Sequence, residues 1–159
     1  KSGETFRLKK DDTTESLKIG DVVTGFLYEN SSRKKVFTLN VPEVTNESYG
    51  WASVTQVRKD LGVFVDIGLE DKDMVVSLDE LPSMKELWPK KNNRLYVTLI
   101  KDKKDRTWAT MGDGQALNEK VIHGHKGLLN KDLTGTVTQV RLVGTTIITP
   151  EGYKLFLHP

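Results

Sequence analysis

The sequence predicts an all-β protein made of small five-stranded barrels, one of them complete and two partial. Two observations lead to this prediction. Residues 44–112 contain five short segments in which apolar and polar residues alternate, as they do in half-buried strands. The pentapeptide VTQVR of Val54–Arg58 occurs again at Val137–Arg141, which indicates that a second unit begins with the same strand.

Five strands are expected in the middle unit. The second is Val63–Gly68. There Val63 and Val65 share one face and Phe64 lies on the other, so Phe64 points outward if the valines fill the core. The other strands are expected at Trp51–Arg58, Met74–Leu78, Leu95–Leu99 and Thr107–Met111.

The segment SLDELPSMKELWPK, between the third and fourth strands, changes period. Leu81, Met84, Leu87 and Trp88 recur at helical spacing, and Pro89 ends the segment, which predicts a short helix. Five short strands with a helix between the third and fourth are typical of the OB-fold, a small and partly open barrel.

Four segments are predicted along the chain. Residues 1–43 are the C-terminal part of a first unit, and residues 44–112 are the complete barrel. Residues 113–133 are Gly-rich and polar and form a linker, and residues 134–159 supply only the first three strands of a third unit. The chain is therefore expected to be a piece of a longer protein, whose other domains are candidate partners.

A second internal match supports the incomplete first unit. The hairpin-like segment from Gly20 aligns with the one from Asn92. In this alignment Asn30 falls on Asp102. Lys34 falls in the same way on Arg106.

Composition excludes several classes of protein. The 159-residue chain has no cysteine, which rules out a disulfide scaffold, a zinc–thiolate site and cysteine catalysis. It has no apolar run of membrane-spanning length and no secretion signal, so no membrane partner is expected and a cytoplasmic location fits. Residues 90–106 are rich in lysine and arginine, which indicates a polyanionic partner, although an ordinary solvated face gives similar runs.

Three motifs resemble the S1 domain, an RNA-binding OB-fold. They are LGVFV at Leu61–Val65, MVVSLDEL at Met74–Leu81, and the pair Asp102 and Arg106. More narrowly, DIGL, DELP…LWP and the LYVTL hairpin resemble the conserved virulence factor B family, cytoplasmic bacterial proteins with tandem S1 domains and a winged helix. The resemblance implies a non-catalytic protein that binds single-stranded RNA and regulates gene expression.

The resemblance also implies contact residues. The RNA-contacting positions of S1 domains fall on Leu61, Phe64, Ser77, Asp102, Arg106 and, in the third unit, His158. Leu61 replaces an aromatic residue of the family pattern, Ser77 replaces its histidine, and Thr146 falls near the Phe64 position of the third unit.

Side-chain chemistry adds roles to these positions. An outward Phe64 can stack on a nucleobase, or it packs against a neighbouring domain or the linker. Lys103, Lys104 and Arg106 can contact phosphates or bases. Asp102 either orients Arg106 or accepts a hydrogen bond from a base amino group, or it bonds its own backbone in the turn. Tyr96 is either a second stacking platform or packing in a domain interface.

No catalytic residue, metal site, cofactor or small-molecule substrate is predicted. The segment GDGQAL lacks the Lys-Ser/Thr of a P-loop, and His123 and His125 make only a weak metal motif. Two alternatives to RNA binding stay open. One is an OB-fold module that docks a partner protein, and the other is part of a nuclease whose active site lies on another domain.

Overall fold

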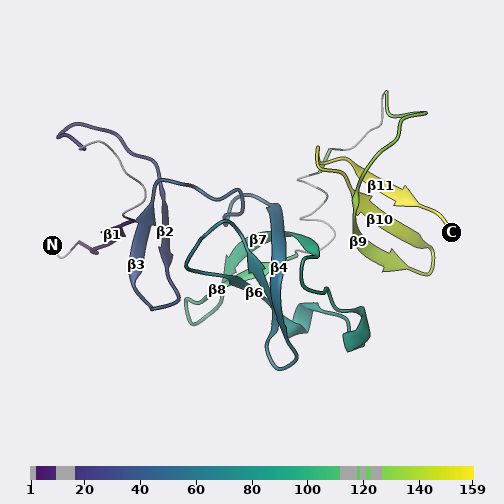
Figure 1. Cartoon of the computed structure of the whole chain (residues 1–159), viewed down its shortest axis with the longest axis horizontal. Coiled ribbons are helices and arrows are strands. Elements are labelled where there is room, and N and C mark those ends of the chain that lie inside the picture. The colour runs from purple at the N-terminus through teal and green to yellow at the C-terminus, as the bar shows by residue number, and fades with distance from the viewer. Residues whose placement is uncertain (1–2, 10–16, 112–117, 119–120, 123–126) are drawn as a thin grey trace.

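The computed structural model describes residues 3–9, 17–111, 118, 121–122 and 127–159. This part of the chain forms one closed barrel and two three-stranded sheets, and Figure 1 shows the barrel between the two sheets. The strands are β1 (Arg7–Leu8), β2 (Phe26–Glu29), β3 (Lys35–Thr38), β4 (Gly50–Arg58), β5 (Gly62–Asp66), β6 (Met74–Ser77), β7 (Arg94–Lys101), β8 (Thr107–Thr110), β9 (Thr136–Arg141), β10 (Gly144–Ile148) and β11 (Lys154–Leu157).

The barrel has the strand order β4-β5-β6-β8-β7, and β7 pairs back with β4 to close it. All neighbours are antiparallel except β6 and β8, which are parallel. The predictions of an all-β OB-type fold and of five strands in this region are confirmed. The interior is filled by valines that are at most 1% exposed: Val54, Val63, Val65, Val76 and Val97.

The segment between β6 and β7 differs from the predicted helix. It forms two 3₁₀ turns, η1 (Leu78–Glu80) and η2 (Lys85–Leu87). Pro82 lies between them, has no N–H to donate and restricts the residue before it to extended conformations. A single helical face therefore does not form: Leu81 and Trp88 are buried, but Met84 and Leu87 are exposed.

The first sheet packs against the barrel. In it β3 lies between β2 and β1, antiparallel to β2 and parallel to β1. Tyr28 of β2 and Val36 of β3 are buried and belong to the same apolar cluster as the barrel valines. The first sheet and the barrel thus share a core.

The second three-stranded sheet lies in the predicted third unit and is called the third sheet here. It repeats the first half of the barrel. Its order is β9-β10-β11, all antiparallel. Each copy of VTQVR carries an irregular pairing at its threonine: Thr55 donates to the carbonyl of Phe64, and Thr138 to that of Thr146. The copies therefore share their bulge as well as their sequence, and Thr146 stands where Phe64 stands in the barrel.

The predicted boundaries at residues 43, 112 and 133 remain predictions. Within the predicted linker, Ile122 forms a parallel bridge with Tyr153, and its N–H donates to the carbonyl of Gly152 at 2.9 Å. This part of the linker is thus attached to the third sheet.

Gly62 is expected to be indispensable to the barrel. Its φ is +137°, and a Cβ there would lie 2.0 Å from the Val76 carbonyl oxygen. Gly62→Ala should lower the free energy of unfolding by about 3 kcal/mol or more, because strain and a backbone clash add together. Gly68→Ala is the control, since φ is +93° but nothing lies within 4 Å. It should cost only about 1 kcal/mol. Urea denaturation followed by tryptophan fluorescence measures both, and equal losses would contradict this account.

Candidate nucleic-acid interface

A row of outward side chains crosses the barrel at the level of Phe64. Phe64 is on β5. The strand register places it between Gln56 of β4 and Val75 of β6. Because Val76 pairs with Ala109, the residues that precede them, Val75 and Trp108, are also neighbours. Trp108 in turn pairs with Ile100 of β7. The Phe64 row is therefore Gln56, Phe64, Val75, Trp108 and Ile100.

Phe64 has the orientation that the sequence predicts. Val63 and Val65 on either side of it are fully buried in the barrel, whereas Phe64 is only partly buried. Its ring thus lies on the outer surface, between Gln56 and Val75 in the row, where a ligand can reach it.

Leu61 and Ser77 lie at one end of this face. The carbonyl of Leu61 accepts the N–H of Leu78 at 3.0 Å, which ties the turn before β5 to the end of β6. The Ser77 hydroxyl accepts the N–H of Asp79 at 3.3 Å and so caps η1. The Ser77 hydroxyl is therefore already engaged in hydrogen bonds within the fold.

Asp102 organises the tip of the β7–β8 hairpin. Its Oδ1 accepts the N–H groups of Lys104 at 2.8 Å and Arg106 at 3.0 Å. Its Oδ2 accepts Nε of Arg106 at 2.7 Å and Nε1 of Trp108 at 3.1 Å. One carboxylate oxygen of Asp102 thus bonds the turn, and the other holds Arg106.

The hydrogen bonds at the tip have an electrostatic consequence. The Arg106 N–H, together with the side chains of Arg106 and Trp108, holds the pKa of the Asp102 carboxyl well below its usual range. The carboxylate is therefore charged at physiological pH. It pairs with Arg106, whose guanidinium lies 5.3 Å from the centre of the Trp108 ring and stays largely exposed.

Trp108 is a member of the candidate site that the sequence alone does not single out. Its indole N–H is bound by Asp102, and its ring supports the Arg106 guanidinium. The useful signal was the alternation of β8, in which Ala109 points inward and Trp108 outward. Without the β6–β8 pairing, however, the sequence did not reveal that Trp108 lies beside Val75 and near Phe64.

Lys103 and Lys104 are the unpaired cations of the tip. Both are exposed, and within the described residues neither forms an ion pair. Lys101, by contrast, lies 2.8 Å from Asp105. The two lysines and Arg106 thus give the tip a positive surface next to the Phe64 row.

Tyr96 lies apart from the Phe64 row, on the β4–β7 side of the barrel. Its ring stacks on Tyr49 at 5.6 Å and contacts Trp51 at 5.0 Å between ring centres, and Arg94 lies over Trp51. Burial, with Glu43 nearby, raises the pKa of its phenol. Tyr96 is therefore a packed member of an aromatic cluster, which we call the Tyr96 cluster (Tyr49, Trp51, Arg94 and Tyr96).

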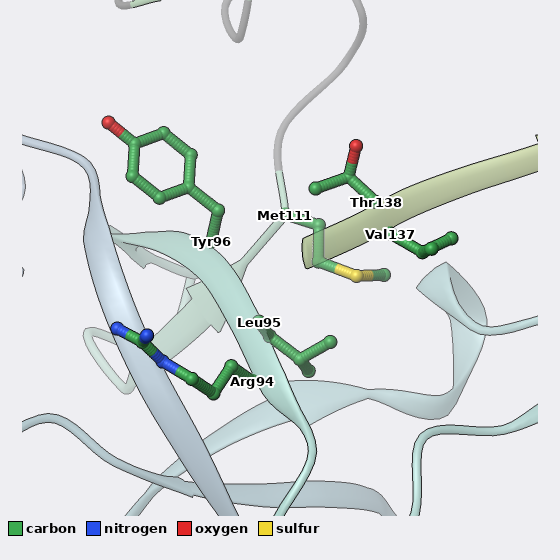
Figure 2. Close-up of a pocket in the computed structure, with 6 residues that line it drawn as sticks. All are labelled: Arg94, Leu95, Tyr96, Met111, Val137 and Thr138. Carbon is green, nitrogen blue, oxygen red and sulfur yellow. The ribbon is translucent and has the colours of Figure 1, made fainter. Parts of the chain in front are cut away.

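A small cavity lies next to the Tyr96 cluster, where β7 meets β9. Its volume is about 60 Å³. Figure 2 shows Leu95, Met111 and Val137 gathered on one side of β7 and Arg94 and Tyr96 on the other. The cavity is small for a drug-sized ligand, and we attach no function to it.

The tip of the first sheet repeats that of the barrel but has a different partner. Asn30 Oδ1 accepts the N–H groups of Ser32 and Lys34, both at 3.0 Å, as Asp102 does at the second tip. Its amide then donates to Asp71 in the β5–β6 loop at 3.1 Å, and Tyr28 donates to the same carboxylate at 2.6 Å. The Asp71 carboxylate of the barrel thus accepts hydrogen bonds from the first sheet at its tip.

Burial raises the pKa of the Asp71 carboxyl, and the hydrogen bonds from Tyr28 and Asn30 more than offset this, so that its pKa is lower than usual. The ionised form therefore stabilises the contact between the first sheet and the barrel.

The described residues show neither a metal site nor a membrane span. No group of three or more His, Cys, Asp or Glu among them could hold a metal ion. No helix in this part of the chain is long and apolar enough to cross a membrane. The histidine pair at positions 123 and 125 lies outside the described residues.

The barrel, the two related sheets and the outward aromatic row define a protein built from S1-type OB-fold units. Residues 49–110 match the family described as the CvfB first S1-like domain, and residues 1–40 match the S1 domain. The Bacillus subtilis protein YitL is 33% identical over 156 residues, which cover 98% of this chain and 52% of that protein. Conserved virulence factor B of Staphylococcus epidermidis is 28% identical over 165 residues, covering 99% of this chain and 53% of that protein.

Residues 49–110 therefore form an S1-like domain of the kind described as the first in CvfB, and the chain as a whole is similar to conserved virulence factor B proteins and spans about half the length of the curated relatives it matches. A solved structure from Streptococcus pneumoniae, described as a multidomain protein with nucleic acid binding domains, has the same fold. The two agree with a TM-score of 0.85 and 41% identity, covering 100% of this chain and 55% of that one.

Removing the Tyr28 hydroxyl tests the contact at Asp71. Tyr28→Phe should lower the free energy of unfolding by about 1.5–3 kcal/mol at neutral pH, since it deletes a hydrogen bond to a carboxylate. Because the folded pKa of Asp71 lies below its ordinary value of 3.8, this stabilisation is complete above that pH and is lost as the pH falls through the folded pKa. Urea unfolding of both proteins across pH measures the difference.

The control is Tyr153→Phe, whose phenol has no hydrogen-bond partner among the described residues and which should change little at any pH. A Tyr28→Phe loss that persists unchanged in acid would contradict the proposed role of the Asp71 carboxylate.

Proposed function

We propose that this chain binds single-stranded RNA across the Phe64 row, without catalysing a reaction. The observation that carries the proposal is the convergence of Phe64, Trp108 and Arg106. They come from β5, from β8 and from the loop before it, and barrel closure brings them to one outward face. An aromatic surface bordered by cations is what a flexible, unpaired nucleic-acid strand requires.

Each part of the surface has a task in this proposal. The Phe64 ring stacks on a base, which contributes about 1–3 kcal/mol per base. Arg106 hydrogen-bonds a phosphate or base while Asp102 fixes its orientation, and Lys103 and Lys104 contact phosphates. Stacking and phosphate contacts accept any base, so sequence preference should be low.

Similarity to these proteins supports a wider role that the chain alone does not reveal. The matched S1-like domains, and the nucleic acid binding domains named for the solved relative, agree with RNA as the ligand. We further propose that the longer protein acts in the bacterial cytoplasm in the regulation of gene expression. Tandem units would raise affinity there through effective concentration.

Docking of a partner protein is the second candidate function. The observation that favours it is the Tyr96 cluster, because tyrosine, tryptophan and arginine are the residues that most often dominate protein interfaces. Salt separates the two functions. RNA binding weakens with salt by a slope of roughly −0.7 per neutralised phosphate, whereas apolar docking depends little on salt.

Fluorescence anisotropy of a labelled oligouridine RNA tests the main proposal. The double variant Phe64→Ala, Arg106→Ala should raise Kd at least about tenfold, since it removes a stacked ring and a cation. Lys34→Ala is the matched control, because Lys34 occupies the Arg106 position of the first tip, where Asn30 contacts Asp71. It should raise Kd less than about twofold, as the loss of one remote charge does.

Binding that is absent in the unaltered chain, or unchanged in a folded double variant, would overturn the proposal. A Lys34→Ala loss equal to that of the double variant would place the RNA on the first tip as well.

A further inference from the structure

The third sheet and the barrel can be superposed residue by residue from their pairing. Gly62 and Gly144 both begin their strand with a positive φ, at +137° and +146°. From these glycines onward Phe64 corresponds to Thr146. Phe64 lies opposite Val75, and Thr146 lies opposite Phe156.

Each unit therefore keeps one aromatic ring in this cross-strand pair, but the ring has changed strands. In the barrel it stands on the second strand with an aliphatic partner, and in the third sheet it stands on the third strand with a threonine partner. Directly opposed side chains have Cβ atoms about 5 Å apart, so the exchange moves the ring by only about one strand spacing.

Phe156 is an exposed aromatic ring whose position is set by a glycine. It is 47% exposed, while Thr146 opposite it is 8% exposed. A Cβ on Gly144 would lie 2.4 Å from Phe156 Cζ, so the ring lies across the glycine and its position depends on the missing side chain there.

His158 lies beside this ring. The two ring centres are 4.9 Å apart, with an interplanar angle of 89°. Thr145 lies opposite Leu157, so His158 follows at the position that Ser77 holds opposite Gly62 in the barrel. The imidazole edge thus supplies a polar group next to an exposed aromatic ring, and it is not used to cap a helix as Ser77 is.

We propose that Phe156 and His158 form a second nucleobase-binding site, in which a base of single-stranded RNA stacks on Phe156 and His158 hydrogen-bonds its edge or the adjoining phosphate. This inference rests on the proposed RNA-binding function and extends it to the third unit. The RNA then contacts two aromatic rings on separate units, Phe64 on β5 and Phe156 on β11. Thr146, at the position where the repeat predicts the stacking residue, is the cross-strand neighbour of Phe156.

Variants at position 156 test the ring itself. Phe156→Leu keeps an apolar side chain over Gly144 but removes the aromatic face, and it should raise the Kd for oligouridine RNA about tenfold. Phe156→Trp should keep the affinity of the unaltered chain. Leu142→Ala is the control, since Leu142 is fully exposed at the β9–β10 turn and lies off the sheet face, and it should have no effect.

Photocrosslinking gives a second, direct measurement. An RNA containing 5-bromouridine, irradiated in complex with the chain, should attach to the C-terminal tryptic peptide at residues 155–159, which contains both Phe156 and His158. The attachment should disappear in Phe156→Leu and persist in Leu142→Ala.

The outcomes are distinguishable. If Phe64→Ala weakens binding while Phe156→Leu does not, and no cross-link reaches residues 155–159, RNA binding stands and the second site is overturned. If the unaltered chain binds no RNA, the proposed function and this site fail together. If Phe156→Leu and Phe156→Trp lose equal affinity with their fold intact, the ring acts through packing and the stacking site is wrong.

Discussion

Closure of the barrel through the parallel pairing of β6 and β8 is the constraint on which the rest of the structure depends. A five-stranded sheet that stayed open would expose the free edges of β6 and β8, and closure removes them. The pairing occurs at Val76 and Ala109, both fully buried. It sets the outward neighbours Val75 and Trp108 side by side, and so it joins β6, the neighbour of the strand that carries Phe64, to the hairpin that carries Arg106. The candidate interface is thus a consequence of how the barrel closes.

The two hairpin tips show how one turn serves two purposes. At both, an oxygen of residue 30 or 102 accepts two N–H groups of the following turn. What differs is the second group of that side chain. The carboxylate of Asp102 accepts from Arg106 and holds that cation at the surface, whereas the amide of Asn30 donates to Asp71 and fastens the first sheet to the barrel. A single change between acid and amide therefore separates a tip that can face a ligand from a tip that binds within the chain.

Much of this fold could be predicted from periodicity, because the alternation of Val63, Phe64 and Val65 determines which face is buried. The repeated VTQVR likewise indicated a second unit with the same first strand, and that strand also repeats the threonine bulge. The short helix was predicted wrongly, because spacing alone does not register that Pro82 prevents a continuous helix. The role of Trp108 depends on contact with a strand some thirty residues earlier, and the position of Phe156 on the adjacent strand depends on cross-strand register. Neither is contained in local patterns.

The most direct measurement uses the three tryptophan indole N–H signals of the chain in a ¹⁵N NMR titration with oligouridine RNA. Trp108 lies in the Phe64 row, Trp51 in the Tyr96 cluster, and Trp88 donates its indole N–H to Pro82 in the loop before β7. If RNA lies across the Phe64 row, the Trp108 signal shifts with saturation and returns when salt is added, while the other two change little. A titration that shifts Trp51 or Trp88 and leaves Trp108 in place would contradict the account.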